Sequence, residues 1–329
     1  MIDRINKLKN QDHKRVNLEE SVKATFFDNK TFPLVISSAN SGYSLKNWLS
    51  ENSKKFETDL LKYGSVLFRN FRINSIEKFQ ELMTIFPKEL LEYKFRSSPR
   101  FELVENVYVS TTYPEDETIN MHSENSYAAN PPARIVFCCI TAAEYRGETP
   151  IADNRLVLEY ISEPLKKKFK EKGVLYRRNL NGVLGLSWQE VFQTSDKTIV
   201  QQECDSNGIN YTWVKENELV LTWKKEAICQ HPETNEWVWF NHSLFFNKYM
   251  LHEDFLNSID SDDELPNNTF FGDGSEISRD EILELKAAYQ KATIEFTWIN
   301  GDVLFLDNLL FSHGRNPYKG DRKIIVSIL

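Results

Sequence analysis

Short strand-like runs fill the middle of the chain and limit the folds that are open to it. Between residues 173 and 245, runs rich in β-branched and aromatic residues alternate with turn signals. The segment HPETNE, between Cys229 and Trp237, predicts a hairpin loop, and the runs read GVLYRRNL, INYTWVK, ELVLTWKK and EWVWFNH. Many short antiparallel strands favour a β-sandwich or a β-barrel, so we expect a mostly β fold.

Helical patterns flank this β region. In residues 44–64 apolar side chains recur at helical intervals up to Gly64, where a helix should end. Residues 248–292 are acidic and predict helical structure, in which Ser278 and Glu281 form a capping box. Further helices are expected over residues 74–92 and in IADNRLVLEYI, and further strands in SVLFRNF, VENVYVSTTYP, ARIVFCCITAA and the last segment from DVLFLDN onward.

The length of 329 residues fits a single enlarged domain, and the sequence has no internal repeat. We therefore expect a polar leader over residues 1–20 and one domain over residues 21–329. This domain would be mostly β with α insertions (α+β), and the insertion at about 248–292 would form a helical lid.

Charge and hydrophobicity exclude several classes of partner. The formal net charge is −8 and Lys and Arg form no dense block, whereas binding of nucleic-acid phosphates needs clustered positive charge. No run approaches the length of about eighteen apolar residues that a membrane span needs, and the start lacks an apolar h-region. The four cysteines form no CxxC pair and are expected to be buried thiols. We expect a cytoplasmic protein that binds neither nucleic acid nor membrane.

The polar segment NMHSENSY, residues 120–127, holds a histidine and a glutamate two positions apart. On an extended strand such side chains point to the same face, so His122 and Glu124 can converge on one cation. A second histidine is needed. His313 is the best candidate because an apolar strand would deliver it to the mouth of a barrel, and His242, in WFNH, is the competitor. Two histidines and one carboxylate leave three metal positions open, which suits ferrous iron in oxygenases.

An arginine and a threonine predict a site for a dicarboxylate cosubstrate. Arg322 follows His313 by nine residues and leads into the strand KIIVSIL, where its guanidinium can grip a carboxylate bidentately. Thr149, in GETP, could add a hydroxyl donor. Arg315, in HGR, is the alternative arginine, or it could face the substrate or brace the loop.

Together, motifs along most of the chain resemble the taurine dioxygenase (TauD/TfdA) family of Fe(II)/2-oxoglutarate-dependent dioxygenases. The similarity runs from about residue 30 to the end, and the SyrP-like members found with peptide-synthetase pathways look most similar. The motifs are LLKYGSVLFRNF, RSSPR, VYVSTTYP, the H-S-E segment, PPARIVFCC, RGETPIADNR, GLSWQEVFQT, VWFNH, FFGDGS and GDVLFLDN with HGRNPYKGDRK.

This resemblance implies a double-stranded β-helix, or jelly roll, with helical insertions. Fe(II) would be held by His122, Glu124 and His313, and 2-oxoglutarate by Thr149 and Arg322, with O2 as the other cosubstrate. Glutamate replaces the commoner aspartate of the metal motif, as in clavaminate synthase-like enzymes. Related halogenases lack an acid at this position, so the resemblance implies oxygenation without halogenation.

The implied activity is hydroxylation of an unactivated C–H bond in an amino acid or amino-acid-derived substrate, free or tethered to a peptidyl carrier protein. Desaturation or cyclisation on the same scaffold stays open, as do a zinc-dependent hydrolase or lyase with the same ligands and a catalytically silent binding protein. A zinc enzyme is disfavoured because the sequence has no HExxH. A homo-oligomer also stays open. The candidate substrate contacts are Asn125, Tyr127, Asn241, Arg315, Arg96 and Arg100.

Overall fold

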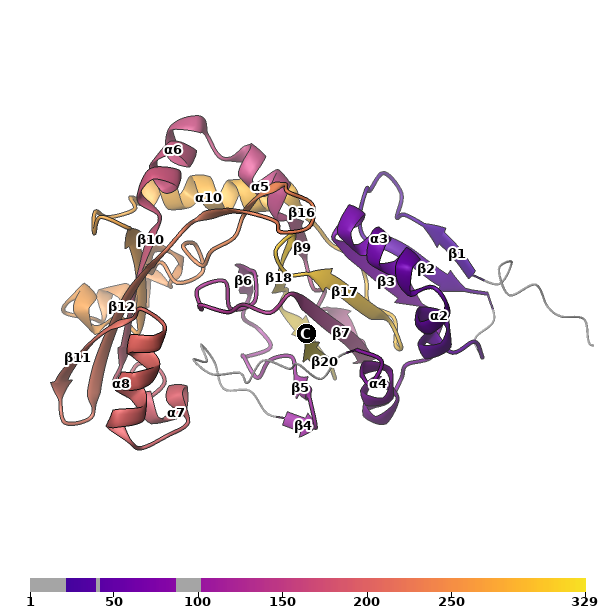
Figure 1. The fold of residues 1–329 in the computed structure, drawn as a ribbon, viewed down its shortest axis with the longest axis horizontal. Helices are drawn as coiled ribbons and strands as arrows, with labels where there is room; N and C mark the ends of the chain where they lie inside the picture. Colours follow the sequence, from indigo (N-terminus) through magenta and orange to yellow (C-terminus); the bar gives the residue numbers. More distant parts are fainter. Residues whose placement is uncertain (1–21, 40–41, 87–101) are drawn as a thin grey trace, which may run out of the picture.

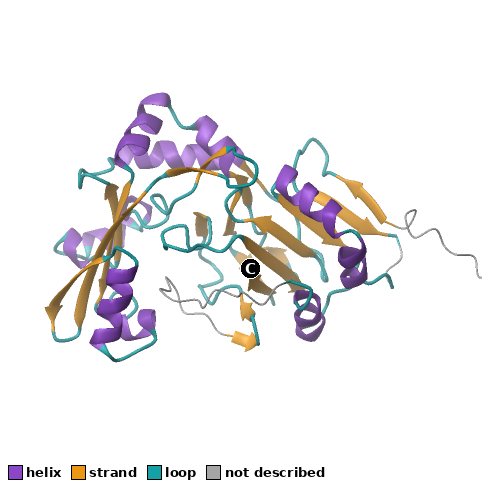
Figure 2. Cartoon of the chain, in the orientation of Figure 1, coloured by secondary structure: helices purple, strands orange, loops and turns teal. Residues whose placement is uncertain are grey.

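The computed structural model describes residues 22–39, 42–86 and 102–329. Strands run through the centre of the molecule and helices lie around them (Figures 1 and 2). The predicted leader, the end of the predicted helix at 74–92 and the candidates Arg96 and Arg100 lie outside the described residues.

The largest sheet has eight strands in the order β1-β2-β3-β17-β7-β20-β5-β4. Its central strands are apolar throughout because successive residues face two different cores. In β7 (Arg134–Thr141), Val136 and Cys138 face the core beneath the N-terminal helices, whereas Ile135 and Phe137 face a second core. The other strands are β1 (Val22–Thr25), β2 (Leu34–Ser38), β3 (Ser65–Arg69), β4 (Glu102–Val104), β5 (Val107–Val109), β17 (Val303–Asp307) and β20 (Lys323–Ile328).

A smaller sheet, in the order β16-β9-β18-β6, packs against the second core. Ile151 and Phe311 of this sheet join Leu304 and Val326 of the large sheet in one apolar cluster. The two sheets therefore share a core, as expected for a sandwich. The strands are β6 (Ile119–His122), β9 (Ile151–Asp153), β16 (Thr293–Ile294) and β18 (Phe311–Arg315).

Three N-terminal helices cover the outer face of the large sheet (Figure 1). The helix predicted over 44–64 is interrupted at Asn52, which ends one helix and starts the next. The predicted end at Gly64 is confirmed, since this residue caps the second helix with φ 68°. A Cβ at this position would lie 2.3 Å from the ring of Phe311, so a glycine suits both the φ angle and the close approach. The helices are α2 (Leu45–Glu51), α3 (Ser53–Tyr63) and α4 (Ile76–Met83).

A third sheet, in the order β11-β12-β10-β15, extends to the left in Figure 1. Its strand β15 (Asn267–Phe271) lies inside the stretch 248–292 that the sequence predicts as helical, so that prediction is wrong for these five residues. Residues 267–271 pair with β10, and Phe271 packs into the apolar core beside the third sheet. These tertiary contacts outweigh the local helical pattern. The other strands are β10 (Val174–Leu180), β11 (Asn210–Lys215) and β12 (Glu218–Lys225).

Several other local predictions are confirmed. Helix α10 (Arg279–Ala292) begins with the Ser278 and Glu281 capping box. The hairpin predicted around HPETNE is formed by β13 (Ile228–Gln230) and β14 (Trp237–Trp239). None of the described helices is long and apolar enough to cross a bilayer. The remaining elements are β8 (Tyr145–Arg146), α5 (Asn154–Tyr160), α6 (Glu163–Lys172), α7 (Trp188–Phe192), α8 (Lys197–Ser206), η2 (Lys248–Met250), α9 (Glu253–Asn257), η3 (Asp262–Glu264) and β19 (Tyr318–Lys319).

Candidate functional site

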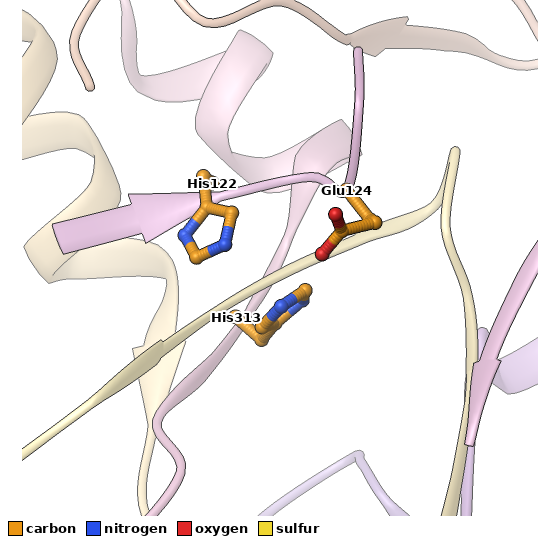
Figure 3. A group of neighbouring side chains, drawn as sticks. All are labelled: His122, Glu124 and His313. Carbon is orange, nitrogen blue, oxygen red and sulfur yellow. The ribbon is translucent and has the colours of Figure 1, made fainter. Parts of the chain in front are cut away.

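Two histidines and a glutamate meet at the open end of the smaller sheet. His122 ends β6, Glu124 lies in the turn that follows, and His313 is in the middle of β18. Because β6 and β18 are antiparallel neighbours, His313 is directly opposite His122. The three side chains point toward one another (Figure 3), and one ligand atom from each lies within 4.8 Å of the others. Of the two histidines considered for the third position, His313 therefore joins the cluster.

The orientation of the His122 ring is set by its own strand. Its Nδ1 lies 2.9 Å from the carbonyl oxygen of Asn120. A carbonyl only accepts hydrogen bonds, so Nδ1 carries the proton and donates it, which leaves Nε2 as the metal-binding atom. The ring of His313 lies between those of His122 and Phe137, with centroids 4.5 and 5.0 Å away. A hydrogen bond thus orients the His122 ring, and ring packing holds that of His313.

The backbone of Glu124 is held by the side chain of Asn308. The Glu124 N–H donates to Asn308 Oδ1 at 2.7 Å, and Asn308 Nδ2 donates to the Glu124 carbonyl at 2.9 Å. The same Nδ2 also donates to the carbonyl of Pro132 at 2.9 Å. Asn308 is fully buried. Asn308 was not among the residues predicted for the site, although an asparagine five positions before His313, in a run of apolar residues, must satisfy its amide locally once it is buried.

Strand β12 supports the same turn from the other side. Trp223 Nε1 donates to the Tyr127 carbonyl at 2.8 Å, and Lys225 Nζ donates to the Ala128 carbonyl. Burial lowers the pKa of Lys225. The turn that carries Glu124 is therefore attached both to the sandwich and to the third sheet.

A cavity of about 480 Å³ opens over the cluster. Part of its wall comes from residues 110–114 and 118–120 and is rich in hydroxyl and amide groups, here called the polar wall; another part, the aromatic wall, comes from His242, Phe245 and Phe246. Thr149 and Arg322 also line the cavity. Among the described lining residues, Glu124 is the only one with a carboxylate side chain. The further lining residues are Phe137, Met250, Leu251, Pro266, Asn267, Gly314, Arg315, Ile324 and Val326, besides the two histidines of the cluster.

Arg322 and Thr149 form a group of hydrogen-bond donors in this cavity. Arg322 Nε donates to the Gly147 carbonyl at 2.9 Å, and its Nη2 lies 3.5 Å from Thr149 Oγ1. Burial, and next the charge of Arg315, lower the pKa of Arg322 to about 10, so it stays charged at neutral pH. Among the described residues no carboxylate forms an ion pair with it, which leaves its charge for an anionic ligand.

Arg315 has a different role. Its Nη1 donates to the Tyr113 carbonyl at 2.8 Å, and its Nη2 donates to the carbonyls of Pro114 and Glu117. These contacts brace the loop that forms the polar wall, which is the third of the roles that the sequence left open for this arginine. Burial lowers its pKa. Arg322, by contrast, donates to a single backbone carbonyl among the described residues.

Three candidate substrate contacts lie behind the cavity wall. Asn241 is buried, and its amide donates to the Ala227 carbonyl and accepts from the Ser243 N–H, so it supports the backbone. Tyr127 is fully buried against Trp223, His242 and Phe246. Asn125 is buried in a turn at φ 50°. None of the three is among the described lining residues of the cavity, so direct substrate contact is not supported for any of them.

His242 lines the cavity but stays outside the metal cluster. Its Nδ1 lies 2.6 Å from Ser126 Oγ, and its backbone N–H donates to the hydroxyl of Tyr176. Complete burial lowers the pKa of His242 well below its usual value, so the ring is neutral at neutral pH. Sequence reasoning considered this histidine only as a ligand, whereas its place is in the wall.

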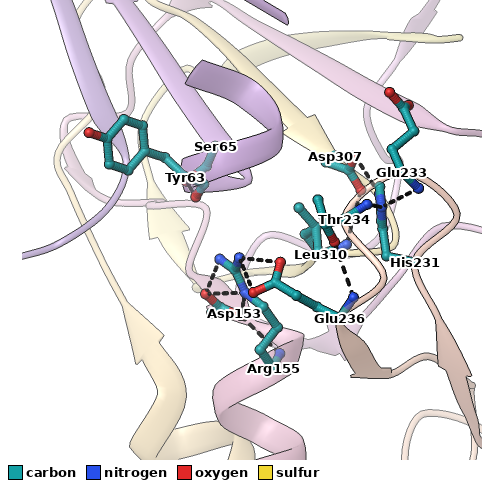
Figure 4. Close-up of polar contacts among 10 residues, drawn as sticks. All are labelled: Tyr63, Ser65, Asp153, Arg155, His231, Glu233, Thr234, Glu236, Asp307 and Leu310. Carbon is teal, nitrogen blue, oxygen red and sulfur yellow. Dashed lines mark hydrogen bonds and ion pairs between the residues drawn. The ribbon is translucent and has the colours of Figure 1, made fainter. Parts of the chain in front are cut away.

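A separate polar network fixes the turn between β17 and β18 from the far side (Figure 4). Asp307 accepts from the backbone N–H groups of Leu309 and Leu310 and from His231 Nε2. Nearby, Arg155 joins Asp153 of β9 to Glu236 of the β13–β14 hairpin. These contacts hold the strand that delivers His313 in place, and they explain why His231 is not part of the metal cluster.

Comparison with known proteins gives a consistent result. The family model for the taurine catabolism dioxygenase TauD, TfdA family matches residues 30–328. The dapdiamide synthesis protein DdaC of Enterobacter agglomerans is 39% identical over 274 residues, which are 82% of this chain and 83% of that protein. A clavaminate synthase-like protein of Arabidopsis thaliana is 26% identical over 321 residues, 92% of this chain and 94% of that protein.

Solved structures agree on the fold. The structure of PvcB from Pseudomonas aeruginosa aligns with a TM-score of 0.56 at 13% identity, over 94% of this chain and 91% of that one. A further PvcB structure describes that protein as an Fe, alpha-ketoglutarate-dependent oxygenase from an isonitrile synthetic pathway. The predicted double-stranded β-helix with helical insertions is confirmed by this likeness.

Proposed function

Because the chain belongs to the TauD/TfdA family of Fe(II)/2-oxoglutarate-dependent dioxygenases, we propose that it hydroxylates an unactivated C–H bond of an amino acid or amino-acid-derived substrate. The observation that carries the proposal is a single cavity lined both by a two-histidine, one-carboxylate cluster and by a pair of donors, the half-buried Arg322 and the buried Thr149. The first group suits a metal and the second suits a carboxylate.

Fe(II) would be held by His122, Glu124 and His313. The donor set fits, because two imidazoles and one carboxylate on one side leave positions open for cosubstrate and oxygen. Glu124 is only 5% exposed, and a divalent cation would compensate the charge of this buried carboxylate. When bound, iron and 2-oxoglutarate activate O2 for attack on a C–H bond, and 2-oxoglutarate becomes succinate and carbon dioxide.

The far carboxylate of 2-oxoglutarate would be held by Arg322 and Thr149. A guanidinium has only donors, and a hydroxyl can add one more, so the pair favours a group that only accepts. Both residues line the same cavity as the metal cluster, as a ligand that spans from metal to arginine requires.

The substrate would lie between the polar wall and the aromatic wall. The protein's part in selectivity is to hold one C–H bond near the metal while the walls exclude water. The likeness to a dapdiamide synthesis protein supports a substrate derived from amino acids in a natural-product pathway. Presentation of that substrate on a peptidyl carrier protein is the finer form of the proposal.

We retain one domain over residues 21–329 as part of the proposal, supported by the family match over residues 30–328. Of the insertion predicted as a lid over about 248–292, only the first part, up to Pro266, would cover the cavity. Met250, Leu251 and Pro266 line the cavity, whereas α10 packs against α5.

The test is product mass spectrometry with Fe(II), ascorbate, O2 and 2-oxoglutarate against matched panels of free and carrier-tethered amino acids. We expect one panel member to gain one oxygen atom, with succinate formed in step. His313→Ala should abolish the product, and the matched control His252→Ala should not, because His252 is exposed and belongs neither to the cluster nor to the described lining residues of the cavity.

Other outcomes identify the alternatives. Loss of two hydrogens would move the assignment to a desaturase or cyclase on the same scaffold. Turnover that needs Zn(II) and neither O2 nor 2-oxoglutarate would identify a hydrolase or lyase, and the donor pair Arg322 and Thr149 would then have no purpose.

A further inference from the structure

Within the part of the chain that the structure describes, the hydroxyl of Thr149 has two hydrogen-bond neighbours, and both can only donate. Trp298 Nε1 donates to Thr149 Oγ1 at 3.1 Å, and Arg322 Nη2 lies 3.5 Å from the same oxygen. An indole N–H and a guanidinium carry no acceptor. The hydroxyl therefore cannot donate its own proton to either neighbour.

This arrangement fixes where the hydroxyl proton can point. A hydroxyl has two lone pairs and one proton. With both lone pairs directed at the N–H groups of Trp298 and Arg322, the proton of Thr149 is left for the cavity that the threonine lines. A ligand atom there meets a donor, and the hydroxyl does not need to reorient when the ligand binds.

Trp298 itself is held rigidly behind the cavity wall. It is 5% exposed, and its ring meets that of Phe296 edge to face with centroids 5.0 Å apart. It is not one of the described lining residues, so it reaches a ligand only through Thr149.

The loop that carries the indole is fastened to the large sheet. Arg69 of β3 donates to the Thr297 carbonyl at 3.0 Å and forms an ion pair with Asp302. Asp302 in turn accepts from the Ile299 N–H at 2.9 Å. The two neighbours of Trp298 in the chain are thus both held by backbone contacts.

We propose that Trp298 is a positioning residue for the cosubstrate, whose indole N–H orients the Thr149 hydroxyl as a donor to the far carboxylate of 2-oxoglutarate. This inference rests on the proposed function and adds to it a residue that never touches the ligand. The ligand atom that meets this hydroxyl must be an acceptor, and a carboxylate, which has only acceptors and carries a negative charge, fits both the hydroxyl and the neighbouring guanidinium of Arg322.

The test is a double-mutant cycle on binding, with Mn(II) in place of iron and 2-oxoglutarate as the titrated ligand, measured by calorimetry. Trp298→Phe removes the N–H and keeps a ring, and Thr149→Val removes the hydroxyl and keeps the shape. We expect Trp298→Phe to weaken 2-oxoglutarate binding about fivefold, the value of one ordinary hydrogen bond. The double variant should bind no more weakly than Thr149→Val alone.

Trp188→Phe is the matched control. Trp188 is also buried, and its indole N–H has no hydrogen-bond partner among the described residues, so its loss should leave 2-oxoglutarate binding unchanged. Additive effects of the Trp298 and Thr149 substitutions, or an equal effect of Trp188→Phe, would overturn the inference.

A second readout serves if Trp298→Phe does not fold. In protein labelled at tryptophan, one indole N–H resonance should shift on Thr149→Val, and that resonance should respond to 2-oxoglutarate in the Zn(II)-loaded wild type but not in the variant. Absence of such a resonance would contradict the inference. If the wild type does not bind 2-oxoglutarate at all, the proposed function itself is wrong. If it binds 2-oxoglutarate but the effects of Trp298 and Thr149 on binding are independent, only the inference about Trp298 is wrong.

Discussion

Asn308 offers the sharpest test of how the fold holds its metal ligand. Asn308→Ala removes three hydrogen bonds, which join the asparagine amide to the N–H and carbonyl of Glu124 and to the carbonyl of Pro132. At about 1 kcal/mol net for each bond, the free energy of unfolding should fall by about 3 kcal/mol. A protein of ordinary stability survives such a loss, so the variant should fold.

The loss should also reach the metal, because the backbone of Glu124 itself loses its hydrogen bonds to the sandwich. Outer partners of metal ligands are typically worth about 10–100-fold in affinity, so calorimetry should show Mn(II) binding at least about tenfold weaker. Urea unfolding measures the stability of the same sample.

Asn316→Ala is the matched control for this variant. Asn316 is also buried, and its amide donates to Glu148 and Glu295 rather than to a metal ligand. It should lose stability and keep Mn(II) affinity. Equal Mn(II) affinity in Asn308→Ala and Asn316→Ala would refute the claim that Asn308 positions Glu124.

Three further predictions concern the ligand choice, a helix end and a thiol. His313→Ala should remove Mn(II) binding in calorimetry, whereas His242→Asn should keep it. Mn(II) binding by the first variant, or its loss in the second, would contradict the choice of His313 over His242 as the third metal ligand. Gly64→Ala should lower the midpoint of thermal unfolding more than Gly208→Ala. Both glycines have positive φ, but only at Gly64 would an added Cβ meet a ring, that of Phe311, at 2.3 Å. Equal shifts of the midpoint would contradict the packing argument. Cys229 is half-buried, unlike the other three cysteines, which are buried as expected. Partial burial still raises the pKa of the Cys229 thiol to about 11, so little thiolate exists at neutral pH. Labelling of the native protein with iodoacetamide should therefore be slow and accelerate as the pH rises toward that value, and fast labelling at neutral pH would contradict the raised pKa.

The sequence predicted best where local chemistry and tertiary structure agree. His122 and Glu124 are two residues apart in the sequence, and this spacing was enough to predict that they converge, although Glu124 lies in the turn after β6 and not on the strand itself. The capping box at Ser278 and Glu281 and the helix end at Gly64 are likewise local signals, and the structure keeps them.

Prediction failed where a contact distant in sequence decides. Strand β15 forms because β10 is there to pair with it, and the surrounding helical pattern gave no sign of that partner. Asn308 contacts Glu124, which lies 184 positions away in the sequence, and Trp298 contacts Thr149, which lies 149 positions away. No rule of sequence spacing predicts either contact. The choice between His313 and His242 needed the register of β18 against β6.

Tyr127 and Asn241 show a further limit. A polar or aromatic residue beside a motif is equally suited to contact a ligand and to support the backbone. The structure places Asn241 in backbone hydrogen bonds and Tyr127 in the core. The position of the cavity distinguishes these residues from His242, which follows Asn241 in the sequence but lines the cavity.

The most direct test of the central claim is an anaerobic titration of the protein with Fe(II) and 2-oxoglutarate, followed by visible absorption. Chelation of a 2-oxo acid by ferrous iron gives a charge-transfer band. We expect the band to appear at one equivalent of each, to be absent in His313→Ala, and to need far more 2-oxoglutarate in Arg322→Gln. A band of unchanged intensity in His313→Ala, or no band in the wild type, would contradict the assignment of this cavity as an iron and 2-oxoglutarate site.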